Sequence, residues 1–214
     1  MKVIYDVGCF KGQWYKQRKK TFPEAEYFYL FDAQNLISSE LLKDKAKFFN
    51  VVLGSIEGEQ VSFWQDGGSG SSYFKELGNT LWNNVEPEIV NTKTLKALIN
   101  ENSLKKPNYL KIDTQSSEIE ILKGLGNYQP LFIKVETHIF SMYKNVSGWN
   151  KVLDYLYDLN YIAIDWKPIG SHATRIPAEM DMMFIPNFNN NSGANIIKSN
   201  KEKNKKYILK KKFI

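Results

Sequence analysis

Short apolar segments alternate with longer amphipathic ones along most of this 214-residue chain. The apolar segment at residues 25–33 (AEYFYLFDA) lacks a polar face, as expected for a parallel strand that is covered on both sides. Further strands are predicted at residues 2–7, 46–54, 107–114, 130–137, 161–166 and 179–187. The amphipathic segments predict helices at residues 12–22, 35–45, 94–102, 116–126 and 147–160.

This alternation predicts an α/β fold with a doubly wound, mostly parallel sheet and helices on both faces. The last two strands are separated only by residues 167–178, too few for a helical crossover, so we expect them to be antiparallel neighbours. Residues 55–65 (SIEGEQVSFWQ) predict a hairpin that turns at Glu57-Gly58. Ligands of such sheets bind beyond the carboxyl ends of the strands, where the strand order reverses.

Composition and charge divide the chain into a folded body and a tail. A hydrophobic content of 43% and an aromatic content of 14% are typical of one packed domain, which we assign to residues 1–188. Residues 189–214 predict an Asn-rich linker and a Lys-rich tail, whose eight lysines and one glutamate exceed the whole net charge of +6. We interpret this tail as a solvated end; the alternative is a weak contact with an anionic surface. The body lacks a basic, aromatic face, so nucleic-acid binding is not expected.

The remaining composition bears on the cellular setting. The single cysteine, Cys9, excludes an internal disulfide framework and a cysteine-based zinc site. No apolar run reaches the roughly 20 residues that span a bilayer, and the N-terminus lacks a secretory signal pattern. We therefore predict a cytoplasmic protein.

Acidic residues stand at the ends of four predicted strands: Asp6, Asp32, Asp113 and Glu136. Side chains at these positions face a crevice rather than the core, so they can reach a ligand. Asp32 follows Gly12 by the 20 residues at which an acid hydrogen-bonds the ribose hydroxyls of a nucleotide. The alternative is a tight strand-to-helix turn, with Asp32 capping a helix.

The loop after the first strand, Gly8–Gly12, indicates which nucleotide is bound. Its sequence GCFKG lacks the middle glycine of the dinucleotide fingerprint, and Phe10 stands where the backbone would approach a pyrophosphate. A cofactor without phosphates fits this loop better. S-adenosylmethionine is one such cofactor.

Ordered motifs between Val3 and Pro186 resemble those of the FkbM-type S-adenosylmethionine-dependent methyltransferases, in the class I methyltransferase superfamily. They are YDVGCFKGQW, YLFDAQ, NVVLGSIEGEQVSFW, SGSSYF, NTKTLKALI, YLKIDTQSSEIEILKGL, IKVET and MDMMFI. The chain departs from the family at Phe10, where asparagine is usual, and at Gln115-Ser116, where Glu-Gly is usual.

This resemblance implies a Rossmann-like sheet of seven strands in the order 3-2-1-4-5-7-6, with the last strand antiparallel. It also implies O-methylation of a sugar, polysaccharide or secondary-metabolite hydroxyl, so the expected partner is a sugar or small-molecule acceptor. Contacts within a homo-oligomer are an alternative use for the chain's aromatic side chains.

By position, the resemblance assigns cofactor contacts to Asp6, Gly8 and Gly12 (methionine part), Asp32 (ribose), Asn50 and Val51 (adenine), Ser71 and Ser72 (near the cofactor or acceptor), and Asp113 (ammonium and sulfonium). A sugar hydroxyl must also lose its proton, and Glu136 and His138, two apart at a strand end, are the candidate bases beside Asp113. Asp113, Glu136 and His138 could instead hold a divalent metal, but we expect no metal because a metal-free base explains the same residues.

Two other functions remain open. The departures at Phe10 and Ser116 suit a non-catalytic binding or scaffold protein that kept the fold and lost turnover. The spacing of glycines and acid alone would also suit an NAD(P)-dependent oxidoreductase.

Overall fold

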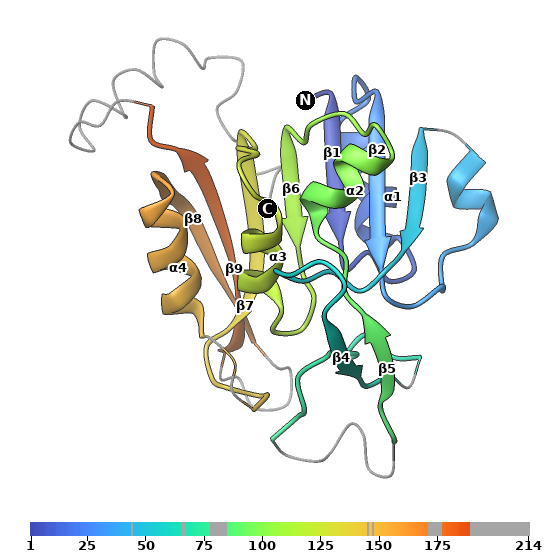
Figure 1. The fold of residues 1–214 in the computed structure, drawn as a ribbon. Helices are drawn as coiled ribbons and strands as arrows, with labels where there is room; N and C mark the ends of the chain where they lie inside the picture. Colours follow the sequence, from blue (N-terminus) through green and yellow to red (C-terminus); the bar gives the residue numbers. More distant parts are fainter. Residues whose placement is uncertain are drawn as a thin grey trace.

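Seven strands form one sheet in the order β3-β2-β1-β6-β7-β9-β8 in the computed structural model, which describes residues 1–43, 45–65, 67–77, 85–144, 146, 148–170 and 177–188 (Figure 1). The strands are β1 (Val3–Val7), β2 (Tyr27–Asp32), β3 (Ala46–Asn50), β6 (Tyr109–Ile112), β7 (Phe132–His138), β8 (Tyr161–Gly170) and β9 (Pro177–Pro186). The first five strands of the sheet are parallel, and β9 is antiparallel to both β7 and β8. The predicted strand order and the antiparallel final pair are therefore confirmed.

The register brings the ends of the parallel strands to one edge of the sheet. Val7 pairs with both Phe31 and Ile112, so the chain leaves β1, β2 and β6 at the same level. Asp32 pairs with Asn50 at the end of β3. The strand order reverses between β1 and β6, which makes this part of the edge the switch point at which ligands bind in such sheets.

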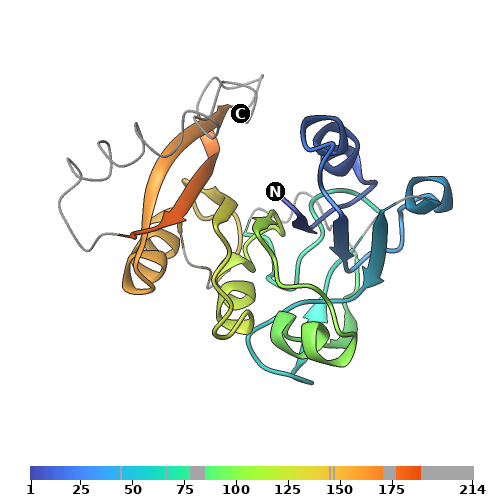
Figure 2. The ribbon, with the colours of Figure 1, turned by 90° about the horizontal axis from the view of Figure 1, so that it is seen from above.

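Helices cover both faces of the sheet (Figure 2). On one face, α1 (Gln13–Thr21) and the short 3₁₀ helix η1 (Ser39–Lys43) pack over the side chains of Ile4, Phe28 and Leu30. The other face packs against α2 (Leu95–Glu101), α3 (Glu118–Gly124) and α4 (Trp149–Asp158). Alternate residues of the buried strands face the two layers, which is why these strands read as continuous apolar runs.

The predicted hairpin at residues 55–65 is wrong. Strand β4 (Gln60–Phe63) instead pairs antiparallel with β5 (Glu88–Asn91), in a second sheet of two strands. The turn around Gly58 is fixed from outside, because the Gly58 N–H donates to the Thr92 carbonyl and the Thr92 hydroxyl donates to the Ile56 carbonyl. Sequence pattern alone does not reveal such a distant partner.

Two helix predictions had different outcomes. Thr94 caps α2 as predicted, since its hydroxyl accepts the Ala97 N–H at 3.1 Å. The helix predicted at residues 35–45 is only the single 3₁₀ segment η1. None of the described helices is long and apolar enough to cross a membrane. The predicted tail at 189–214 lies outside the described residues.

Candidate active site

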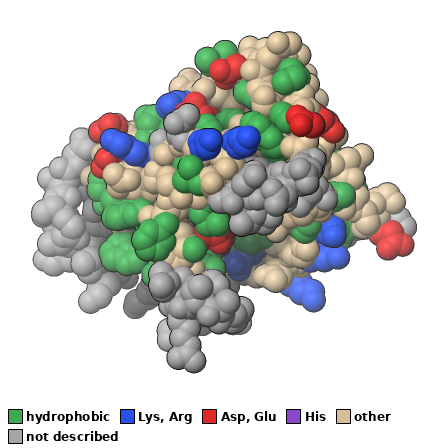
Figure 3. Space-filling model, turned by 90° about the horizontal axis from the view of Figure 1, so that it is seen from below, with side chains coloured by type: hydrophobic (Ala, Val, Ile, Leu, Met, Phe, Trp, Pro, Cys, Tyr) green, Lys and Arg blue, Asp and Glu red, His purple; other side chains and the backbone are tan. Residues whose placement is uncertain are grey.

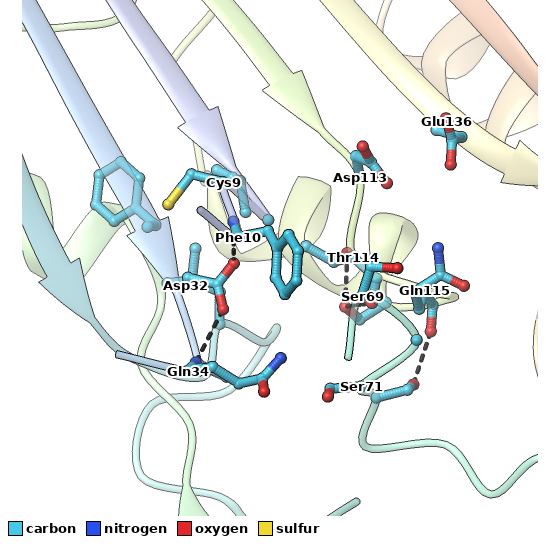
Figure 4. A pocket seen from close by; sticks show the side chains of 18 of the residues that line it. Cys9, Phe10, Asp32, Gln34, Ser69, Ser71, Asp113, Thr114, Gln115 and Glu136 are labelled. Atoms are coloured by element: carbon cyan, nitrogen blue, oxygen red, sulfur yellow. Dashed lines mark hydrogen bonds between the residues drawn. The ribbon is translucent and has the colours of Figure 1, made fainter. Parts of the chain in front are cut away.

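A cavity of about 670 Å³ opens at the carboxyl ends of β1, β2 and β6, on the face seen from below in Figure 3. Its volume lies in the range of small-molecule sites, about 300–1,000 Å³. Figure 4 shows side chains from the ends of several strands converging on it. The cavity therefore occupies the switch point at which the sequence placed a ligand.

The backbone amides of the first loop are already used within the protein. The N–H groups of Gly8 and Cys9 donate to the Phe31 carbonyl, and the Gly12 N–H donates to the Cys9 carbonyl. The Phe10 N–H donates to Oδ2 of Asp32 at 2.6 Å. A pyrophosphate on such a loop is held by its backbone N–H groups, and these four are directed elsewhere.

Gly8 is required by the protein's own backbone. Its φ is +71°, and a Cβ there would lie 1.7 Å from the carbonyl oxygen of Asp113. The absent side chain therefore lets the β1 loop pack against the end of β6. We had expected this glycine to admit a ligand, and its tightest neighbour is instead Asp113.

Asp32 ties this loop to the end of β2. Its Oδ1 accepts the Gln34 N–H at 2.8 Å, while Oδ2 holds the Phe10 amide (Figure 4). Burial raises the pKa of this carboxyl, although the two backbone donors act in the opposite direction. Asp32 lines the cavity and keeps lone pairs for a ligand, since an ionised carboxylate has about four acceptor sites.

Lys111 joins the ends of β1 and β6 below the cavity. Its ammonium lies 3.0 Å from Asp6, 3.1 Å from Asp113 and 2.9 Å from the Gly8 carbonyl. Asp6 is fully buried and does not line the cavity. The structure therefore does not place it where the predicted contact with the cofactor would need it. Its carboxylate instead balances a lysine that is 4% exposed.

Carboxyl groups collect at the β7 end of the cavity. Asp113, Glu136 and Glu179 all line it. Burial, followed by the negative charge of Asp113, raises the pKa of Glu136 to about 9. Burial and the same neighbour also raise the pKa of Glu179. A hydrogen bond with the Asp113 carboxyl group also favours the protonated form of Glu136.

His138 stands beside this group rather than in the main cavity. It is 5% exposed, its ring packs on Tyr143, and its Nδ1 lies 3.6 Å from Oε1 of Glu179. Burial lowers the pKa of the imidazole, so it is neutral at pH 7. His138 lines only a narrow side space with Glu136 and Asp113, and a role as the base would have to act through them.

A wall of neutral polar groups closes the cavity opposite the first loop. Tyr143 donates to the side-chain oxygen of Gln115 at 3.0 Å, and Ser72 donates to the Gln115 carbonyl at 2.6 Å. Gln115 also hydrogen-bonds Glu179. Gln115 stands where the family motif usually has an acid. Its hydrogen bonds therefore connect this loop to the segments that contain Ser72, Tyr143 and Glu179.

The next residue of that motif, Ser116, is buried and faces away from the cavity. Its N–H donates to Oε1 of Glu118, which also accepts the N–H and hydroxyl of Thr114. Burial raises the pKa of Glu118 to about 7. Glu118 thus fixes the start of α3, and it does not line the main cavity.

The structure brings together six of the predicted site residues around the cavity: Gly8, Asp32, Ser71, Ser72, Asp113 and Glu136. Gly12, Asn50, Val51 and His138 do not line it among the described residues, and neither does Asp6. Gly12, with φ +74°, packs under Ile37 and Leu41, next to the start of α1.

At the end of β3, the residues that line the cavity are the two that follow the predicted pair in the sequence. The Asn50 amide donates to the carbonyls of Asp32 and Ala33, outside the cavity. Val52 and Leu53, just beyond the positions that we had assigned to the adenine, provide the apolar lining. The sequence VVLG at residues 51–54 is uniformly apolar, so it does not indicate which of these residues lines the cavity.

The sequence reasoning missed Glu179, which reaches the cavity from β9. Tyr143, an aromatic residue that could stack on a sugar ring, reaches the cavity from a loop. No group of three His, Cys, Asp or Glu side chains in the described part of the chain is arranged to hold a metal ion. The alternative of a metal on Asp113, Glu136 and His138 therefore has no geometric support there.

The sheet order and the cavity at its switch point define the class I methyltransferase fold. Residues 23–163 match the Methyltransferase FkbM domain, so the chain belongs to the FkbM methyltransferase family.

A solved structure agrees at the level of the fold. The methyltransferase FkbM of Methylobacillus flagellatus KT is 10% identical, with a TM-score of 0.51 over 85% of this chain. Our chain spans 43% of that protein's length. The methyltransferase domain of bacterial CtHen1-C is 9% identical, with a TM-score of 0.40 over 86% of this chain and 89% of that domain. No curated protein matches the sequence.

Proposed function

We propose that this protein is an S-adenosylmethionine-dependent O-methyltransferase, acting on a hydroxyl of a sugar, polysaccharide or secondary metabolite in the cytoplasm. Membership of a methyltransferase family supports the reaction class. The observation that carries the choice of cofactor is the first loop, whose amides at Gly8, Cys9, Phe10 and Gly12 are satisfied by the protein. Such a loop suits a ligand without phosphates, and it argues against an NAD(P)-dependent oxidoreductase.

The cavity fits S-adenosylmethionine in charge as well as in position. Asp32 offers its remaining lone pairs to ribose hydroxyls, and Val52 and Leu53 offer an apolar surface to adenine. Asp113 and Glu136 lie at the other end, where the cationic ammonium and sulfonium groups would stabilise ionised carboxyl groups. The cofactor, when bound, supplies a methyl group that is already activated by its sulfonium.

Because the methyl group is activated, the protein's main task is to position the acceptor. The acceptor hydroxyl must also lose a proton, and Glu136 is the carboxyl group in the cavity best placed to take it. Its pKa of about 9 means that Glu136 is protonated at neutral pH in the free protein. The positive charge of a bound cofactor would favour its ionised form, which is a stronger base than an ordinary carboxylate. Asp113, which is paired with Lys111, lines the same part of the cavity.

Isothermal titration calorimetry with S-adenosylmethionine tests this proposal. We expect saturable binding to the wild-type protein, and loss of binding in Asp32→Ala. Asn50→Ala is the matched control, since Asn50 contacts the same segment from outside the cavity and should leave the affinity within about twofold. Absence of binding to the wild type at millimolar cofactor would refute the proposal.

Methyl transfer to a panel of sugars, with labelled cofactor, separates the enzyme from the second candidate function, a non-catalytic binding protein. Cofactor binding without transfer to any hydroxyl acceptor would favour the scaffold. A titration with reduced nicotinamide cofactor completes the comparison, and we expect no binding there.

A further inference from the structure

The aromatic ring of Phe10 stands inside the cavity instead of joining the core. In Figure 4 the ring lies between Asp32 and Thr114, and all three residues line the same cavity. Its backbone has a φ of +49°, a left-handed conformation that is unfavourable for a bulky residue. The hydrogen bond from the Phe10 N–H to Asp32 stabilises this backbone conformation, from which the side chain lines the cavity.

The ring of Phe10 can bind a cation. The face of an aromatic ring carries partial negative charge, and the ammonium of Lys11 already lies 5.0 Å from the Phe10 centroid. Asp113 and Glu136 add carboxyl groups to the same cavity. An aromatic face combined with carboxylates is the arrangement by which proteins recognise cations that lack hydrogen-bond donors, such as quaternary ammonium groups.

A sulfonium is a cation of this kind. We propose that Phe10 is a specificity-determining residue whose ring binds the sulfonium of S-adenosylmethionine and so favours it over the neutral product, S-adenosylhomocysteine. The inference rests on the proposed function, and it assigns a use to the residue at which this chain departs from the family motif. The ring's attraction ends when the methyl group leaves, which favours exchange of product for fresh cofactor.

Calorimetric affinities for three probes test the role of the ring. S-adenosylmethionine is cationic, S-adenosylhomocysteine is neutral, and sinefungin carries an ammonium group near the position of the sulfonium. In Phe10→Leu, which keeps an apolar side chain without a ring, we expect the preference for both cationic probes over the neutral one to fall about 3- to 30-fold. Phe10→Tyr keeps the ring and should retain the wild-type preference.

Phe10→Asn provides a second variant without the ring, because asparagine tolerates positive φ better than leucine does. It should show the same fall in preference, even if Phe10→Leu does not fold. An unchanged ratio of the affinities in the variants without the ring would overturn the inference, as would a fall of equal size in Phe10→Tyr. Failure of the wild type to bind any of the three probes would instead overturn the proposed function.

Discussion

Ser116 offers a direct test of how the loop before α3 is held. Its φ is +89°, in the region that side chains rarely adopt, and its buried hydroxyl has no hydrogen-bond partner. The family motif that this segment resembles usually has glycine where this chain has Ser116. We expect Ser116→Gly to stabilise the protein.

The size of the effect follows from three contributions. A left-handed conformation costs a residue with a side chain about 1–2 kcal/mol, which glycine avoids. An unpartnered buried hydroxyl costs a further ~1–3 kcal/mol. Glycine loses about 0.5–1 kcal/mol through the greater freedom of its unfolded chain. The net gain should be about 1–4.5 kcal/mol in the free energy of unfolding, or about 2–18 °C in Tm for a chain of this length.

Urea unfolding, monitored by circular dichroism, measures this gain in the free energy of unfolding. Two further variants separate the effect of the hydroxyl from that of the backbone and provide a control. Ser116→Ala removes the hydroxyl but keeps the strained backbone, so it should be more stable than the wild type and less stable than Ser116→Gly. Ser117→Gly makes the same exchange one residue later, at φ −94°, and removes the hydrogen bond from Ser117 to Thr114. We expect this neighbouring variant to lose stability.

The reasoning would be refuted if Ser116→Gly were no more stable than Ser116→Ala, because the backbone at φ +89° would then cost nothing. Ser116 does not line the cavity, so the glycine variant should also bind S-adenosylmethionine as the wild type does. A change in affinity would show that this loop reaches the ligand after all.

Three further substitutions test the ends of the strands. Gly8→Ala should destabilise by more than about 2 kcal/mol because of the Asp113 carbonyl behind it, whereas Gly58→Ala, at φ +74° with nothing within 4 Å, should cost ~1 kcal/mol or less in urea unfolding. Lys111→Met should cost about 3–5 kcal/mol, since it strands the buried Asp6 carboxylate, and equal stability in thermal unfolding would contradict the ion pair. Because the pKa of Glu136 is raised to about 9, its contribution to stability is complete below about pH 4 and falls as the pH rises toward 9. The stability of Glu136→Gln relative to the wild type should therefore rise between pH 5 and pH 8. Parallel profiles of unfolding free energy against pH for the two proteins would count against the raised pKa.

The sheet was predictable from the sequence because its signals are local. Continuous apolar runs mark the buried strands, and the short connection before β9 requires an antiparallel final pair. The register then places Asp32 and Asp113 at one edge without further information. The hairpin at 55–65 failed for the opposite reason, since its partner strand at 88–91 is remote in the sequence.

The site was predictable only in part, because burial and pairing decide what an acid at a strand end can do. Asp6 and Asp113 have the same position in the pattern, yet only Asp113 lines the cavity. The difference arises from the register, because Asp6 lies inside β1 opposite Lys111, whereas Asp113 follows the last residue of β6. Lys111 pairs with both carboxyl groups. Glu179 shows the converse. It lies near the start of β9 and lines the cavity because its register places it opposite His138 at the end of β7.

The strained residues of the chain support the same location for the chemistry. Of the five described non-glycine residues with positive φ, three lie in the two loops at the switch point: Phe10, Gln115 and Ser116. Strain of this kind persists only where surrounding contacts enforce it, and it gathers at functional sites. Phe10 is enforced by Asp32, and Gln115 is held by the hydrogen bonds that join it to Tyr143 and Ser72. Phe10 and Gln115, which depart from the usual residues of two family motifs, therefore both line the cavity.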